Sequence, residues 1–278
     1  MMVQIYPILF LVGIGLLAGI VLAVASTIMA VPIDETAAAL EEVLPGANCG
    51  GCGYSGCAGY AAAMADGSAQ LGLCSPGGSA VASLTAEILG QEAGEVMRKT
   101  ALVHCMGNDE NTTDKMNYDG LQSCAAAMLL AGGVSSCKYG CMGLGDCQAA
   151  CEYGAVHIVD GLAMIDPNSC TGCSKCIRAC PKQIIGFVDL KSQAVVRCSS
   201  CDKAKETMAA CKVGCIACKK CERTCKFDAI HVKDFCASVD SEKCVACGEC
   251  VDVCPRKIID IFGVRHEIEN VPATAATK

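Results

Sequence analysis

Two runs of cysteine carry the clearest chemistry in this chain, because each places four thiols at short, fixed spacing and ends in proline. The runs are Cys170-x2-Cys173-x2-Cys176-x3-Cys180 and Cys244-x2-Cys247-x2-Cys250-x3-Cys254. Thiolates at this spacing hold [4Fe–4S] clusters: the first three wrap a loop round one cluster, and the fourth binds its neighbour. The pattern therefore predicts clusters in pairs.

This ligand pattern is that of bacterial ferredoxins, and the second run has a complete partner in Cys215-x2-Cys218-x2-Cys221-x3-Cys225. Each run is expected to supply its fourth cysteine to the cluster held by the first three cysteines of the other run. Two [4Fe–4S] clusters result. One is predicted to be held by Cys215, Cys218, Cys221 and Cys254, and the other by Cys244, Cys247, Cys250 and Cys225.

An internal repeat extends the prediction toward the N-terminus, since nine cysteines from Cys124 to Cys180 match nine from Cys198 to Cys254 at a constant offset. The first repeat departs at Leu144, which stands where Cys218 stands in the second, and Cys137 is the predicted replacement. The predicted ligand sets of the first repeat are then Cys137, Cys141, Cys147 and Cys180, and Cys170, Cys173, Cys176 and Cys151.

A fifth cluster is predicted earlier in the chain, at Cys49-x2-Cys52-x4-Cys57-x16-Cys74. Glycines around these cysteines allow the backbone to approach a cluster and leave amide groups free to donate to sulfur. A structural zinc site also uses four thiolates. Iron–sulfur is the preferred interpretation because ferredoxin-type motifs follow downstream.

Six cysteines remain after these five quartets. They are Cys105, Cys124, Cys198, Cys201, Cys211 and Cys236. A possible sixth cluster, held by Cys105, Cys124, Cys198 and Cys211 between the repeats, is one hypothesis. Free thiols buried in small cores are the alternative.

Composition agrees with small units held by sulfur: 26 of 278 residues are cysteine, tryptophan is absent, and only 4% are aromatic. Disulfides and metal ligands are the two explanations for so much cysteine. The cluster motifs favour ligands, and because cluster assembly needs reduced thiols, the cluster domains are expected on the cytoplasmic side of the membrane.

Residues 1–33 contain no charged side chain and include a long apolar run. Its length predicts an uncleaved, single-pass transmembrane helix in the inner (cytoplasmic) membrane. A cleaved signal peptide is the alternative, but no basic residue precedes the run.

The expected fold class is α+β: a single N-terminal transmembrane helix, a small [4Fe–4S] domain, and two tandem two-cluster ferredoxin repeats. Hairpins are predicted about Asp160-Gly161 and Lys233-Asp234. The predicted divisions are a transmembrane anchor (1–33), an N-terminal cluster domain (34–100), a connecting segment (101–136), repeat 1 (137–197), repeat 2 (198–262) and a C-terminal tail (263–278).

No phosphate-binding loop, dinucleotide fingerprint or nucleophile–base pair is visible, so we expect electron transfer without a catalytic residue and without NAD or flavin in this chain. No nucleic acid partner is expected. The net charge of −7 arises near the N-terminus, whereas the last repeat is slightly basic. An acidic electron carrier is therefore expected to dock around Lys219, Lys220, Arg223 and Lys226, although a solvated helix face explains these residues equally well.

The order of apolar anchor, "NCGGCGYSGC" motif and paired ferredoxin repeats resembles the B subunit of the Rnf complex, a membrane-bound ferredoxin:NAD+ oxidoreductase. The resemblance implies an oxidoreductase component that accepts electrons from reduced ferredoxin and relays them through its [4Fe–4S] clusters to partner subunits. Those partners reduce NAD+ and translocate Na+ or H+. It also places the Cys49 motif nearest the membrane subunits.

Two other classes of function remain open from the sequence. The chain could be an electron-carrying subunit of another membrane oxidoreductase, such as a hydrogenase or a system that reduces a redox-sensing regulator. It could instead be a non-catalytic iron–sulfur assembly or storage protein.

Overall fold

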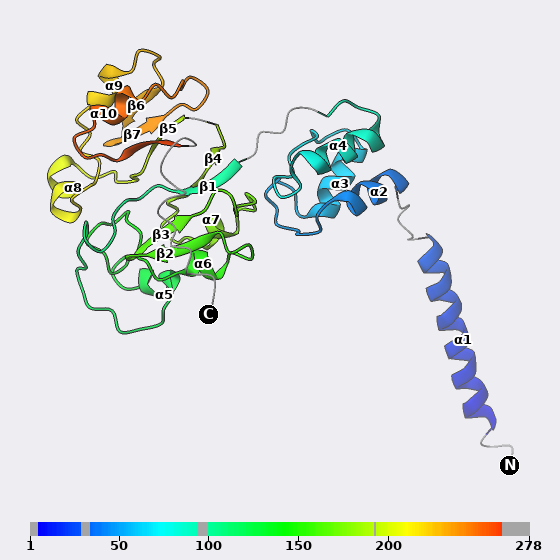
Figure 1. Cartoon of the computed structure of the whole chain (residues 1–278). Coiled ribbons are helices and arrows are strands. Elements are labelled where there is room, and N and C mark those ends of the chain that lie inside the picture. The colour runs from blue at the N-terminus through cyan, green and yellow to red at the C-terminus, as the bar shows by residue number, and fades with distance from the viewer. Residues whose placement is uncertain (1–4, 29–33, 94–98, 192, 263–278) are drawn as a thin grey trace.

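The computed structural model describes residues 5–28, 34–93, 99–191 and 193–262. Along the chain, one long helix is followed by a small helical domain and then by two α+β units that lie against each other (Figure 1). The predicted C-terminal tail, 263–278, lies outside the described residues.

The first helix, α1, runs from Ile5 to Ile28. Within the residues that the structure describes, no helix is both long enough and apolar enough to cross a membrane. The predicted single N-terminal transmembrane helix in residues 1–33 is therefore not supported.

The small helical domain contains α2 (Glu35–Val43), α3 (Cys57–Ala65) and α4 (Gly78–Leu89). Asp34 begins α2 as its N-cap, because its carboxylate accepts the amide N–H of Thr36 at 2.9 Å. The domain core is small: Leu40, Leu44, Tyr60 and Met64 are buried, and Cys52, Cys57 and Cys74 pack against them. Cysteine side chains therefore provide much of the core packing that large apolar side chains provide in larger domains.

Repeat 1 is a ferredoxin-like unit built from two antiparallel strand pairs and short helices. Strand β1 (Lys99–Val103) pairs with β4 (Ile185–Asp189), and β2 (Val156–Val159) pairs with β3 (Leu162–Ile165). The β2–β3 turn uses Asp160 and Gly161 at φ 47° and 72°, as predicted, because this hairpin turn needs two left-handed residues. The helices of this unit are α5 (Cys124–Met128), α6 (Asp146–Ala149) and α7 (Lys175–Ala179).

Repeat 2 has the same organisation. Strand β5 (Gln193–Val196) pairs with β8 (Ile259–Phe262), and β6 (Ile230–Lys233) pairs with β7 (Cys236–Val239). Its helices are α8 (Ala204–Ala210), α9 (Lys220–Thr224) and α10 (Glu249–Asp252). The predicted hairpin is present, but its left-handed residues are Asp234 and Phe235, one position later than expected.

The first strand of each repeat lies earlier in the chain than the cysteine pattern indicates. Strand β1 falls across the predicted N-terminal domain and connecting segment, yet it pairs with β4 of repeat 1. Strand β5 falls at the end of predicted repeat 1, yet it pairs with β8 of repeat 2. Each repeat therefore begins before its first cysteine, and strand pairing rather than ligand spacing determines where.

The two repeats pack through their terminal strand pairs, where Leu102, Val188, Val195 and Phe262 form one buried cluster. Hydrogen bonds reinforce this contact. Arg197 Nε donates to the carbonyl of Val103 at 3.0 Å, and the ring Nδ1 of His104 lies 2.8 Å from the carbonyl of Val196. The strands that enter the two repeats are thereby fixed to each other, which sets the distance between the cysteines that follow them.

Shortening Leu102 tests this packing. Leu102 is 2% exposed, so Leu102→Ala removes buried methyl groups and should cost about 2–5 kcal/mol. We expect the urea concentration at half-loss of structure to fall clearly. Leu121→Ala is the matched control, because Leu121 is 75% exposed and its shortening should change stability by less than about 0.5 kcal/mol. Equal midpoints for the two variants would contradict the role given to Leu102.

Candidate iron–sulfur centres

The folded chain gathers its cysteines into six groups of four, leaving only Cys201 and Cys236 outside them. In the part of the chain that the structure describes, no three His, Cys, Asp or Glu side chains converge closely enough to hold a single metal ion. Four of the six groups instead line small hollows of similar size. A repeated hollow lined by four thiols fits an inorganic cluster, which spreads its ligand sulfurs apart.

The first group is in the helical domain and contains the predicted Cys49, Cys52, Cys57 and Cys74. Burial, with the nearby Cys57, Cys49 and Cys52, raises the pKa of the Cys74 thiol. The loop that returns Cys74 is held by Tyr60, whose hydroxyl donates to the carbonyl of Gln70 at 2.8 Å and accepts the amide of Leu73 at 3.2 Å. Tyr60 lies outside the cysteine pattern, so ligand spacing alone gives it no role.

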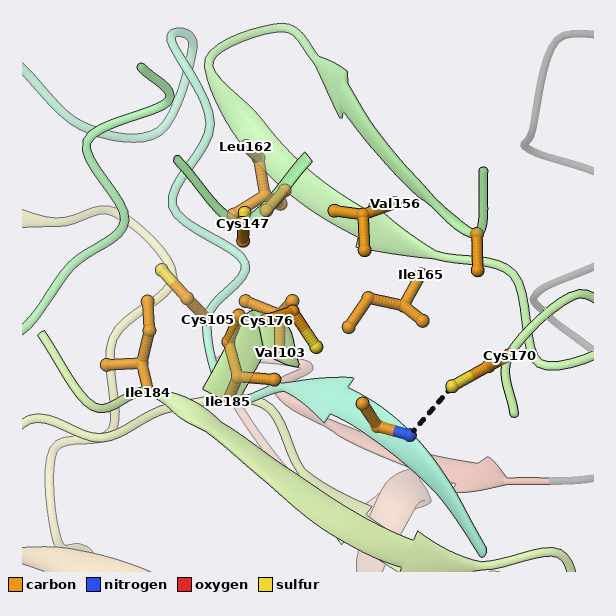
Figure 2. Close-up of a cluster of buried hydrophobic side chains, with 13 residues drawn as sticks. Val103, Cys105, Cys147, Val156, Leu162, Ile165, Cys170, Cys176, Ile184 and Ile185 are labelled. Carbon is orange, nitrogen blue, oxygen red and sulfur yellow. Dashed lines mark hydrogen bonds between the residues drawn. The ribbon is translucent and has the colours of Figure 1, made fainter. Parts of the chain in front are cut away.

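The second group lies in repeat 1 and contains the predicted Cys151, Cys170, Cys173 and Cys176. Burial, followed by Cys170, Cys173 and Cys151, raises the pKa of Cys176 to about 12. Backbone amides point at these sulfurs: Ala101 N–H donates to Cys170 Sγ at 3.5 Å, and Ala155 N–H donates to Cys151 Sγ at 3.3 Å. Figure 2 shows Cys170 and Cys176 among the apolar side chains of the repeat 1 core.

The third group differs from the prediction. Its cavity is lined by Cys124, Cys141, Cys147 and Cys180, together with apolar residues that include Ile184 and Ile185. Cys137 was the predicted fourth ligand here, and it does not line this cavity. The geometry therefore favours Cys124 as the replacement for the sulfur lost at Leu144.

Asp146 explains why Cys124 takes this place. Its carboxylate accepts the amides of Cys124 and Ala125 at 3.0 and 2.9 Å and the hydroxyl of Ser123 at 3.1 Å. These bonds join the start of α5 to the start of α6. Because α6 carries Cys147 in the same cavity, the carboxylate brings the Cys124 sulfur to the group.

The fourth group lies between the repeats, and here Cys137 takes the position predicted for Cys124. The cavity is lined by Cys105, Cys137, Cys198 and Cys211. Burial, with Cys211 and Cys198 nearby, raises the pKa of Cys137. The amide of Gly107 donates to Cys105 Sγ at 3.3 Å, and that of Ser200 donates to Cys198 Sγ at 3.5 Å. These four cysteines therefore form a candidate site for the hypothesised centre between the repeats, with Cys137 in place of Cys124.

The last two groups lie in repeat 2 and contain the predicted residues. One cavity is lined by Cys215, Cys218, Cys221 and Cys254, and the other by Cys225, Cys244, Cys247 and Cys250. Burial, with neighbouring thiols, raises the pKa of Cys221 and of Cys250 to about 11. Cluster ligands must be thiolates, so occupation of such sites by iron and folding of the sites are coupled.

Cys236 lies between the fourth and fifth groups although it belongs to neither. Its thiol donates to the carbonyl of Cys198 at 3.2 Å. Its proximity also lowers the pKa of the Cys198 and Cys215 thiols, because the Cys236 thiol can hydrogen-bond to either thiolate. The remaining cysteine, Cys201, is exposed.

Direct contacts join neighbouring groups. Within each repeat the two groups share a core, and Cys147 is close enough to Cys176, as Cys221 is to Cys250, for their charges to interact. At the central group the contacts are hydrogen bonds. The amide of Cys141 donates to Cys105 Sγ at 3.5 Å, and the amide of Cys215, its repeat equivalent, donates to Cys198 Sγ at 3.3 Å.

The helical domain contacts repeat 1 at the loop that carries Cys170 and Cys173. Arg178 Nη1 donates to the carbonyl of Cys49 at 2.7 Å. Gly51 lies so close that a Cβ there would be 3.3 Å from the carbonyl oxygen of Gly172 and 3.8 Å from the carbonyl carbon of Cys173. The six groups therefore form one row, from the helical domain through repeat 1 and the central group to the far edge of repeat 2.

The chain matches three family models. Residues 44–76 match a model described as a putative Fe-S cluster, and residues 164–185 and 237–260 match two models described as 4Fe-4S binding domains. The first covers the cysteines of the helical domain. The other two each contain a Cys-x2-Cys-x2-Cys-x3-Cys run.

Curated relatives extend the similarity over most of the chain. It is 43% identical over 246 residues, 88% of this chain and 74% of the relative, to the B subunit of the Na+-translocating ferredoxin:NAD+ oxidoreductase complex of Acetobacterium woodii. It is 40% identical over 260 residues, 93% of this chain and 98% of the relative, to the B subunit of the ion-translocating oxidoreductase complex of Methanosarcina acetivorans. The B subunit of the proton-translocating ferredoxin:NAD+ oxidoreductase complex of Clostridium ljungdahlii is 39% identical over 246 residues, 87% of each chain.

Paired substitutions test the exchange of Cys124 and Cys137. Cys124→Ala with Cys180→Ala alters one group, so the double variant should lose about four iron atoms per chain, as each single variant does. Cys124→Ala with Cys211→Ala alters two groups and should lose about eight. Iron and acid-labile sulfide assays measure both. The opposite result, additive loss for the first pair and non-additive loss for the second, would restore the ligand sets predicted from spacing.

Removing the Arg178 side chain tests the contact between the helical domain and repeat 1. Arg178→Ala deletes a charged hydrogen bond of about 1.5–3 kcal/mol and should speed hydrogen exchange of the amides around Gly51. Arg223→Ala is the control, because Arg223 lies on the short helix α9 of repeat 2 and its hydrogen bonds in the described residues go to carbonyls of its own segment, Lys219 and Cys218. Unchanged exchange in Arg178→Ala would show that the contact does not hold the domain.

Proposed function

The chain belongs to the family of B subunits of ion-translocating ferredoxin:NAD+ oxidoreductase complexes, and from this premise we propose that it carries electrons from reduced ferredoxin through six [4Fe–4S] clusters to the other subunits of such a complex. It is thus the electron-transfer subunit of an oxidoreductase rather than a complete enzyme.

The unbroken row of cysteine groups is the observation that carries this proposal. Each group has a neighbour in direct contact, through a shared core, an amide-to-sulfur hydrogen bond, or the Gly51 contact. An electron could therefore pass along the chain in short steps. Two of the amides that donate to Cys105 and Cys198 are those of Cys141 and Cys215, which belong to the neighbouring groups. These amides would also stabilise negative charge on a reduced cluster.

The central group is the element that joins the two repeats into one path. Without a cluster at Cys105, Cys137, Cys198 and Cys211, the repeats would be separate pairs of clusters. A storage protein has no need for such a junction, which argues against the assembly or storage alternative. The alternative of another membrane oxidoreductase is disfavoured by the similarity to B subunits over most of the chain.

We also propose where the chain works. Relatives are named as subunits of complexes that translocate Na+ or protons, and we infer that this chain acts at the inner (cytoplasmic) membrane in a hetero-oligomer of the same kind. Its cluster domains would face the cytoplasm, because thiols remain reduced there and disulfides are rare.

Removal of the central cluster tests the relay. In the purified complex, Cys211→Ala should abolish most NAD+ reduction driven by reduced ferredoxin, whereas Cys201→Ala should leave it unchanged because Cys201 lies outside every group. Iron analysis of the Cys211→Ala complex should show a loss of about four atoms, which confirms that only one cluster is missing. Normal NAD+ reduction after that loss would overturn the proposal that electrons pass through the central group.

A further inference from the structure

The two repeats present the same cluster loop to very different surroundings. The loop Cys170–Cys176 of repeat 1 and the loop Cys244–Cys250 of repeat 2 are equivalent in the internal repeat. In repeat 1 Cys173 is 8% exposed, and its loop is in contact with the helical domain. In repeat 2 the equivalent Cys247 is exposed. One edge of the molecule is therefore covered, and its counterpart is open.

The covered edge shows which kind of partner this surface accepts. It holds a second cysteine group, with Cys49 and Gly51 against the loop that carries Cys173. The contact is made by backbone atoms and one arginine, so the two groups approach closely. In this fold, the outer cluster loop is thus a place where another iron–sulfur domain docks.

The open edge has exposed apolar side chains around its exposed cysteine. Val245 is 56% exposed and Phe227 is 46% exposed, and both line the cavity of the group that contains Cys247. An exposed apolar centre beside polar residues is typical of a protein–protein interface.

The open edge cannot accept the chain's own helical domain in the manner of repeat 1. Ala246 stands where repeat 1 has Gly172, and a Cβ at Gly172 would lie 3.0 Å from the carbonyl oxygen of Lys99 and 3.1 Å from Ser75 Cβ. Asp252 stands where repeat 1 has Arg178, so the donor to the Cys49 carbonyl is missing. The two edges therefore differ in shape and charge, and the open one is left for a different molecule.

Charge beside the open edge is mixed, because Glu249 lines the cavity of the Cys247 group and Asp252 lies on the same helix, α10. Helix α9 packs on α10 and carries exposed Lys220 and Arg223. Two lysines of the predicted docking face form ion pairs within the chain. Lys219 lies 3.5 Å from Glu222, and Lys226 lies 2.6 Å from Glu249. Lys219 and Lys220 line the cavity of the neighbouring group, with Cys215 and Cys218. At the open edge the contact is therefore provided by the apolar side chains of Phe227 and Val245.

We propose that Phe227, Val245 and Cys247 form the docking surface for the reduced ferredoxin that loads this chain; the proposal rests on the electron-transfer function above. One electron leaves the ferredoxin, which is oxidised, and reduces the cluster held by Cys225, Cys244, Cys247 and Cys250. No bond forms or breaks, and no proton is transferred. Electrons then enter at the far edge of repeat 2 and leave at the helical domain.

Stopped-flow oxidation of prereduced ferredoxin by the cluster-loaded full chain tests the docking surface. Val245→Glu places a negative charge at its centre and should lower the second-order rate constant by about tenfold or more, while reduction by dithionite stays at the wild-type rate. Leu129→Glu makes the same change at a residue that is 86% exposed elsewhere and should alter neither rate. Iron content is measured for each protein. If Val245→Glu fails to load, Phe227→Ser replaces it with the same expectation.

The outcomes separate the two proposals. A wild-type chain whose clusters dithionite reduces, but which does not oxidise ferredoxin, would refute the proposed electron donor. A wild-type chain that oxidises ferredoxin, with Val245→Glu or Phe227→Ser equally fast, would refute only the docking surface. A rate that falls equally in Leu129→Glu would show a general charge effect and would also overturn it.

Discussion

The cost of burying thiolates determines how this chain is built. A thiolate removed from water is unfavourable, and burial raises the pKa of Cys105, Cys147 and Cys176 to about 12. Iron bound to these sulfurs would offset that cost, and amide groups such as those of Gly107 and Ala155 already donate to them. The cores are consequently small and rich in cysteine, and folding of each unit is coupled to the formation of its centre.

The same requirement explains the contacts between units. Few large apolar side chains lie between the units, so backbone contacts supplement the one apolar cluster of Leu102, Val188, Val195 and Phe262. Gly51 meets Gly172, the amide of Cys141 meets Cys105, and the amide of Cys215 meets Cys198. Contacts of this kind are short, so they keep neighbouring cysteine groups close. Stability and electron transfer thus depend on the same atoms.

Cysteine spacing predicts the groups in which all ligands lie within one local pattern, such as both groups of repeat 2, because a short loop and a returning helix fix their geometry. Spacing does not decide between Cys124 and Cys137. The choice depends on Asp146, whose bonds to Cys124 and Ala125 join two helices, and nothing in the repeat marks that carboxylate. Strand β1 was assigned to other segments because its partner β4 lies more than eighty residues later. The predicted transmembrane helix in the apolar N-terminal segment is not supported, because no helix in the described residues is long and apolar enough to cross a membrane.

Duplication alone would give two equivalent ends, and a relay needs ends that differ. Two positions remove the equivalence. Gly172 and Arg178 allow repeat 1 to bind the helical domain, whereas Ala246 and Asp252 at the same positions of repeat 2 do not. The first pair closes one end onto another part of the same chain, and the second leaves Cys247 exposed. Because the groups follow one another in series, covering one end and exposing the other would determine where an external electron carrier reaches them. Gly172 and Arg178 are thus two differences between the repeats that distinguish the covered end from the open one.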